Sequence, residues 1–193
     1  MQPRSITSQS DLFNRAAEEA SAALSKWLGR PTRIAIRDVR AVPLDQAVEL
    51  LGAADTPMVA CAMRITGAVD GVLMLACDDT SGLALADLLL GRDAGGSQEW
   101  GDIETSAVVE TANIIGCAYL NAMADSDGTG SAKTLLPSPP WFARDFAGAV
   151  METAVMPQAM VANEVFLTHT DFTIEGCPIT CSLLFIPEAQ APA

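Results

Sequence analysis

The stretch from residue 106 to residue 123 is the longest uninterrupted helical pattern in the chain, and its two faces differ. One face is an apolar stripe with four-three spacing, which is typical of a helix packed on a core. Its members are Val108, Ala112, Ile115, Tyr119 and Ala122. Polar residues with the same spacing run two positions out of step, about 200° around the helix, so they lie opposite the stripe. They are Ser106, Glu110, Asn113 and Cys117. The sequence therefore predicts an anchored helix that holds a carboxylate and a carboxamide one turn apart on its outer face.

A Glu-x-x-Asn pair is by itself a common pattern, and its simplest interpretation is a solvated helix face. For Ser106, first-turn helix chemistry is a better explanation than a direct catalytic role. The pattern gains weight because an earlier helix carries a related pair. Asp11 and Asn14 each stand 99 residues before Glu110 and Asn113, and the apolar stripe of both helices keeps the same phase to the pair.

The elements between these helices also recur in the same order. Each half reads helix, strand, helix, strand, strand, with an added helix at the end of the first half, and a polar, glycine-rich loop at 92–101 separates the halves. We therefore predict one domain over residues 1–193, with half-repeats at about 11–91 and 102–187. The expected fold class is α+β, in which the pseudo-two-fold duplicated halves share one β-sheet core and the two long helices lie on the outside.

Hydrophobic periodicity and turn residues give the expected element boundaries. The expected helices are 11–28, 43–51, 79–90, 103–124 and 139–154. The expected strands are 32–42, 58–65, 72–77, 133–137, 159–168 and 177–186. In the first long helix, the apolar stripe includes Leu24 and Trp27. In the last helix, Pro139 and Pro140 are expected to form the start, and Trp141 and Phe142 to anchor it in the core. A partner-binding edge is the alternative interpretation of these two aromatic residues.

Composition excludes several function classes. Half of the 193 residues are hydrophobic and 18% are charged, so the chain has enough apolar material for a proper core. Its 11 basic and 24 acidic residues give a net charge of −13, which disfavours nucleic acid and anionic membranes as partners. No apolar run has the length of a membrane span, and the first residues lack the apolar core of a signal peptide. We expect a cytoplasmic protein without membrane insertion.

The cysteines point to the same compartment. There are five, an odd number, and no Cys-x-x-Cys pair, so buried free thiols are the favoured interpretation. Cys177 and Cys181 could share a strand face and bind a metal, but His169, the single histidine, has no ligand cluster around it. We therefore predict no metal and no cofactor held by the chain itself.

The helix at 106–123 also carries a family resemblance. Ser106, Glu110 and Asn113, continued by Ile114 and Tyr119, resemble the second active-site helix of the CheC/CheX/FliY family of chemotaxis phosphatases, whose pattern is Asp/Ser-x-x-x-Glu-x-x-Asn. The resemblance extends over nearly the whole chain. It includes the end of the first long helix at 23–30, Leu136–Pro140, and the closing pattern from Ile174 to Pro187.

The resemblance implies a phosphatase that hydrolyses the aspartyl phosphate of a CheY-type response regulator, whose receiver domain holds Mg²⁺ in its own acidic site. It implies that Asn113 orients the attacking water and that Glu110 pairs with the receiver's lysine. A CheD deamidase is a second implied partner. Asp11 and Asn14 would form a degenerate second site, because aspartate is one methylene shorter than the family's glutamate. The alternative is a non-catalytic receiver-binding or adaptor module of the chemotaxis or flagellar-switch type.

Overall fold

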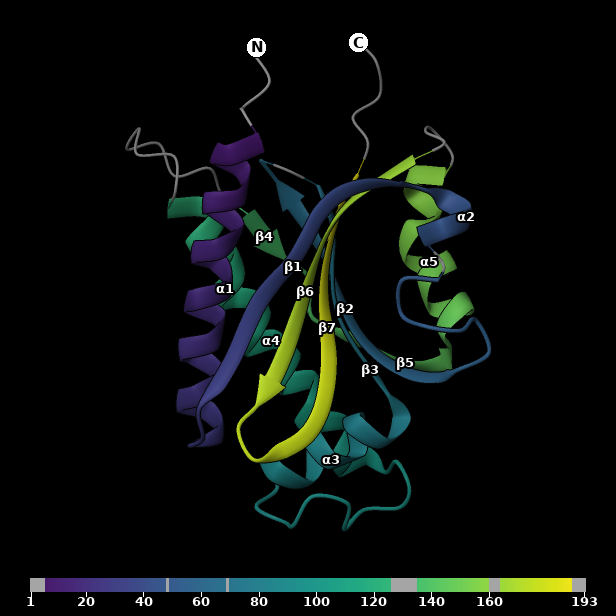
Figure 1. Cartoon of the computed structure of the whole chain (residues 1–193). Helices are drawn as coiled ribbons and strands as arrows, with labels where there is room; N and C mark the ends of the chain where they lie inside the picture. Colours follow the sequence, from purple (N-terminus) through teal and green to yellow (C-terminus); the bar gives the residue numbers. More distant parts are fainter. Residues whose placement is uncertain (1–5, 48, 69, 126–134, 160–163, 189–193) are drawn as a thin grey trace.

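The structure is a computed structural model that describes residues 6–47, 49–68, 70–125, 135–159 and 164–188. Helices and strands are interspersed along these segments (Figure 1). The helices are α1 (Ile6–Leu28), α2 (Leu44–Ala47), α3 (Asp79–Leu89), α4 (Asp102–Asp125) and α5 (Ala147–Ala159). The strands are β1 (Thr32–Pro43), β2 (Pro57–Gly67), β3 (Gly71–Asp78), β4 (Leu135–Pro137), β5 (Trp141–Phe146), β6 (Glu164–Ile174) and β7 (Cys177–Pro187).

These strands form one antiparallel sheet with helices on both faces. Its order is β1-β6-β7-β3-β2-β4, and β5 pairs with β2 next to β4. The long helices α1 and α4 lie on one face, whereas α2 and α5 lie on the other (Figure 1). The α+β class, the shared sheet and the outer position of the two long helices are therefore as expected.

The strand order is symmetric about the sheet centre. The hairpin strands β3 and β7 are neighbours there, with β2 and β6 outside them. At one edge of the sheet, β1 from the first half of the chain pairs with β6 from the second half. At the other edge, β4 and β5 from the second half pair with β2 from the first half. Two duplicated halves that exchange their edge strands would give this order; the repeat boundaries themselves stay a prediction.

The helix α1 covers the free edge of β1. The backbone N–H groups of Thr32 and Ile34 donate to the hydroxyl oxygens of Ser25 (2.9 Å) and Ser21 (2.8 Å). Both serines belong to the polar side of α1, so that side partly faces the sheet rather than water. An edge strand with satisfied N–H groups cannot pair with another chain there.

The prediction of a helix from residue 139 was wrong at its start. Residues 141–146 form β5, and α5 begins only at Ala147, whose N–H donates to the carbonyl of Thr56 (2.9 Å). The two prolines thus link β4 to β5 instead of opening a helix, because both strands pair with β2. Trp141 is 43% exposed and does not anchor the core, whereas Phe142 packs against it.

Other boundaries differ because neighbouring elements run further than the local pattern indicates. The helix α1 already begins at Ile6, and α5 extends to Ala159, where a strand was expected to begin. The strand β6 is described from Glu164, and residues 160–163 of the expected strand lie outside the described residues. The helix α2 is only one turn long. The helix α4 begins at Asp102, one residue earlier than expected, since the carbonyl of Gly101 already accepts from Thr105 N–H (3.0 Å).

Each sheet face carries its own core, and three cysteines lie in these cores as buried free thiols. Cys61, Cys77 and Cys181 pack under α1, α3 and α4, while Cys117 and Cys177 are half-buried. Burial and the neighbouring Cys77 thiol raise the pKa of Cys61 to about 12, so it stays protonated. Within the described ranges, no three His, Cys, Asp or Glu side chains gather as metal ligands.

By length and composition α4 would suffice to cross a membrane, contrary to the expectation that no segment does. The span Asp102–Ala124 has a mean hydropathy of 1.2, only just in the range of membrane helices. Its apolar stripe lies inside the core, and 39% of its most apolar window is buried. Burial against the sheet and α1 therefore accounts for the stripe of α4 that faces inward.

Candidate functional site

The inner face of α4 fixes the rotation of the helix. Val108, Ala112, Ile115 and Tyr119 are all buried in the core, as the spacing predicts. Gly116 lies between them, where an added Cβ would come within 2.5 Å of the Met63 methyl group. The helix therefore approaches the sheet closely, and its opposite face must point outward.

That outer face carries the predicted pair. Ser106 and Glu110 are exposed, and Asn113 is half-buried in the same row. The thiol of Cys117, one turn further on, donates a weak hydrogen bond to the Asn113 carbonyl oxygen (3.7 Å). This contact restrains the carboxamide, and among the described residues no hydrogen bond engages its amino group. The structure thus places both side chains where another molecule can reach them.

The related pair on α1 lies at the other end of the helix pair. The two helices run antiparallel: Arg15 lines a groove with Asn121, whereas Trp27 lines one with Ser106 and Glu110 (Figure 1). Asn14 is exposed, and the side chain of Asp11 is outside what the structure describes. The fold therefore keeps the two pairs apart and does not combine them into one site.

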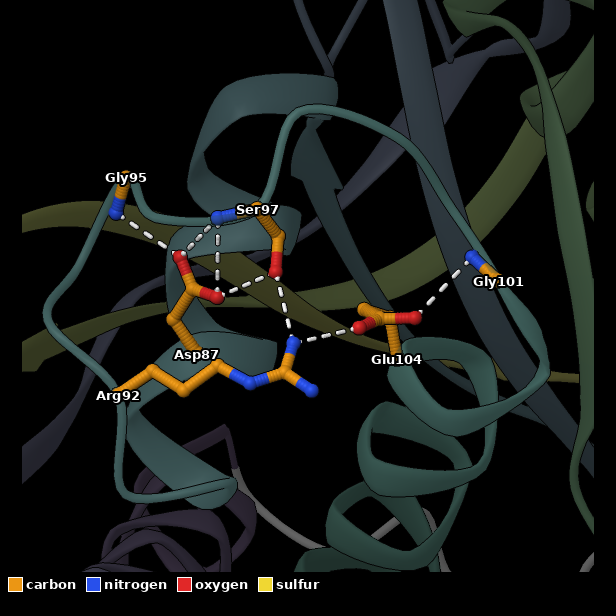
Figure 2. Close-up of polar contacts among 6 residues, drawn as sticks. All are labelled: Asp87, Arg92, Gly95, Ser97, Gly101 and Glu104. Carbon is orange, nitrogen blue, oxygen red and sulfur yellow. Dashed lines mark hydrogen bonds and ion pairs between the residues drawn. The ribbon is translucent and has the colours of Figure 1, made fainter.

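The first turn of α4 is braced by a polar network from the loop before it (Figure 2). The Arg92 guanidinium contacts the Glu104 carboxylate (2.6 Å) and donates to the Ser97 hydroxyl (3.0 Å). Glu104 also accepts from the N–H of Gly101 (3.2 Å), as in a capping box. The hydrogen bond from Arg92 lowers the pKa of Glu104, so the carboxylate is ionised at neutral pH. The Gly-x-x-Glu spacing was the sequence signal for this brace, which our sequence analysis missed.

At the centre of this network is Asp87, a fully buried carboxylate of α3. Its oxygens accept hydrogen bonds from the N–H of Gly95 (2.9 Å) and from both the N–H (3.0 Å) and the hydroxyl (2.5 Å) of Ser97 (Figure 2). Burial works against ionisation, but these donors outweigh it and lower the pKa of Asp87. The loop is thus tied to α3 at one end and to α4 at the other. An aspartate inside the apolar run of α3 could have indicated this role.

A groove of about 450 Å³ begins at Glu110 and runs toward the start of α4. It is lined by Trp27, Leu89, Leu90, Asp102, Ile103, Ser106, Ala107 and Glu110. Trp27 was predicted to lie in the core stripe of α1, yet it is 49% exposed, while Leu24 is fully buried. The predicted apolar stripe of α1 does face the core as far as Leu24. Its last member, Trp27, lies beside the exposed start of α4 and lines this groove instead.

Comparison with known proteins gives the fold a context. The curated relative CheY-P phosphatase CheC of Bacillus subtilis (strain 168) is 24% identical over 162 residues, covering 83% of this chain and 76% of CheC. The chain is therefore similar in sequence to CheC. The resemblance expected from the sequence is therefore confirmed, although no protein-family model matches the chain.

Solved structures share the fold of this chain along nearly its whole length. FliY from Thermotoga maritima superposes with a TM-score of 0.72 at 22% identity, covering 97% of this chain and 91% of FliY. A chain from the CheX–CheY–BeF3–Mg²⁺ complex of Borrelia burgdorferi has a TM-score of 0.61 at 14% identity, with 93% and 99% covered. The FliM middle domain from H. pylori has a TM-score of 0.59 at 14% identity, with 97% and 94% covered.

Proposed function

We propose that this CheC-like chain is a phosphatase for the aspartyl phosphate of a CheY-type response regulator. The observation that carries the proposal is the position of Glu110 and Asn113, one turn apart on the outer face of a helix whose other face is buried. A solved relative of this fold was crystallised with CheY, BeF3 and Mg²⁺, which supports a receiver domain as the partner. In this proposal the Mg²⁺ belongs to the receiver, the chain needs no cofactor of its own, and the protein works in the cytoplasm.

Asn113 has the chemistry to orient a water molecule. Its carboxamide offers both a donor and an acceptor and does not change protonation near neutral pH, so it can hold a water in line with the phosphorus. The water oxygen would form the new P–O bond, the bond to the receiver's aspartate would break, and the proton would leave with the phosphate. Phosphoryl transfer through a loose transition state needs positioning more than a strong base.

Glu110 has the chemistry to dock the receiver. It is exposed and lies one turn before Asn113, so a lysine of the partner can reach its carboxylate without displacing any part of this chain. An ion pair of this kind becomes stronger once the interface excludes water. Ser106, one turn earlier still, would support the helix start and contact the partner only at the rim.

The direct test is the decay of a CheY-type receiver that has been phosphorylated by a small-molecule phosphodonor. We expect the wild-type chain to accelerate the decay and Asn113→Ala to remove most of that acceleration. Met156→Ala, which changes an exposed residue of α5 on the other sheet face, is a matched control that should behave as wild type. No acceleration for any cognate receiver, or full activity in Asn113→Ala, would contradict the proposal.

A second candidate function is a non-catalytic receiver-binding or adaptor module. The observation that favours it is the likeness to the FliM middle domain, whose fold covers almost this entire chain. Receiver binding that survives in a Glu110→Ala/Asn113→Ala double variant, with no hydrolysis by the wild type, would support this candidate. CheD binding is a further proposal that rests on the family resemblance, and co-purification of the two proteins would test it.

A further inference from the structure

The groove beside Glu110 has no role in the chemistry proposed above, although it lies against the same helix face. Its floor and walls are apolar: Leu89 and Leu90 come from the end of α3, Trp27 from the end of α1, and Ile103 and Ala107 from α4. Trp27 is 49% exposed and Ile103 is 60% exposed, so both keep apolar surface in contact with water. Large apolar side chains around a concave site are the residues that most often dominate binding at protein interfaces.

The charge at this groove indicates what kind of side chain it accepts. Among the residues that line it, the charged ones are Asp102 and Glu110, and both are exposed carboxylates. A partner whose apolar side chain entered here beside an acidic residue would meet repulsion, whereas one with a neighbouring lysine or arginine would be attracted. The complementary occupant is therefore an apolar side chain flanked by a basic one.

The groove lies close to Asn113, the residue proposed to act on the receiver's aspartyl phosphate. Ile103, Ala107 and Glu110 follow helical spacing on one side of α4, and Asn113 continues the same row. At 1.5 Å per residue, Ala107 lies about 9 Å before Asn113 along the helix axis. A receiver whose phosphorylated aspartate reaches Asn113 must therefore also cover the groove.

We propose that this groove binds one apolar side chain of the phosphorylated receiver, within about 10 Å of its aspartyl phosphate, together with a basic neighbour that meets Asp102. The contact selects which receiver the chain accepts and adds affinity without touching the reacting atoms. The identity of the partner rests on the proposed function, but the experiment below separates the two.

The test measures binding and turnover separately. Binding is followed by calorimetry with a CheY-type receiver that carries beryllium fluoride and Mg²⁺ in place of the phosphoryl group. Trp27→Ala and Ile103→Lys should each raise Kd and KM about tenfold, with a much smaller change in kcat. Ile103→Leu should retain binding, and Met156→Ala, an equally exposed apolar residue on α5, should leave Kd unchanged. Unchanged thermal unfolding of each variant shows that the fold is kept.

Each outcome decides between the two ideas. Kd within twofold of wild type in both Trp27→Ala and Ile103→Lys overturns the groove proposal, even if hydrolysis is normal. An equal loss in Met156→Ala, or an effect of Trp27→Ala on the oligomeric state alone, overturns it as well. If the wild type binds the receiver through the groove but does not hydrolyse the phosphate, the groove proposal stands and the phosphatase proposal fails. Absence of any receiver binding overturns the groove proposal.

Discussion

The two ends of the α1–α4 pair carry related acid-x-x-Asn motifs in very different surroundings. At the Glu110 end, α3 and the loop 91–101 pack around the start of α4, tie it down through Asp87 and Glu104, and form an apolar groove. Next to Asn14, a groove of about 650 Å³ runs along α1 from Arg15 to Lys26, and most of the side chains that line it are charged or small. Its lining residues are Arg15, Glu19, Ala22, Ala23, Lys26, Ala118, Asn121 and Ala122.

The comparison separates the motif from its setting. Both ends of the helix pair have an asparagine on the outer face of a helix, so the position of the asparagine alone does not distinguish the two ends. The difference is the extra helix α3, which the first half of the chain has after its hairpin, and the short loop that binds α3 to α4. We infer that the motif becomes a working site where neighbouring elements hold its helix and offer the partner apolar surface.

Removing each asparagine in turn should give the largest contrast between the two ends. Asn113→Ala should lower the rate of receiver dephosphorylation about 100-fold, because the water loses its orientation, whereas Asn14→Ala should change the rate less than about twofold. The measurement is the decay rate of the phosphorylated receiver. Residual activity of Asn113→Ala that disappears in the Asn14→Ala/Asn113→Ala double variant would show that the first pair also works.

Removing the charge of Asp87 should lower the free energy of unfolding by about 2–3 kcal/mol at neutral pH. The reason is that Asp87→Asn replaces a charged acceptor that receives four hydrogen-bond contacts. The folded-state pKa lies below the ordinary value of 3.8, so this stability is present above that pH and is lost as pH falls through the lowered pKa.

The measurement for Asp87 is urea unfolding of both proteins at neutral pH and at about pH 3, where the difference between them should shrink. Asp93→Asn, an exposed acid of the same loop, is the matched control and should leave stability unchanged. A stability difference that persists undiminished in acid would mean that Asp87 acts through packing and not through its charge.

Filling the space above Gly82 should produce a smaller effect at the same end. An added Cβ would collide with a methyl group of Val59 and lie 2.9 Å from the Trp100 ring, so Gly82→Ala should lower the unfolding free energy by about 1–2 kcal/mol. Because α3 also walls the groove, KM for the receiver should rise while kcat changes little. Thermal unfolding and steady-state kinetics measure both, with the exposed Thr80→Ala as control. Wild-type stability in Gly82→Ala would show that α3 is not tightly seated.

How far the sequence could predict the fold depended on whether the decisive contacts were local. The outward position of Glu110 and the burial of Ile115 followed from helical periodicity, and the strands expected at 58–65 and 72–77 are close to the observed β2 and β3. The start of α5 was wrong because Pro139 and Pro140 are equally compatible with the beginning of a helix and with a link between two strands. Only pairing with β2, about 80 residues earlier in the chain, distinguishes the two.

The candidate site shows the same division. The sequence by itself determined the acid–asparagine pair, its turn of separation and its place opposite an apolar stripe, because covalent geometry sets the helical period. The tertiary structure decided that Trp27 leaves the core, that Asp87 is buried among loop donors, and that an apolar groove opens beside Glu110. Those features depend on where α1 and α3 end relative to α4. Packing between distant segments sets such positions, and no local pattern encodes them.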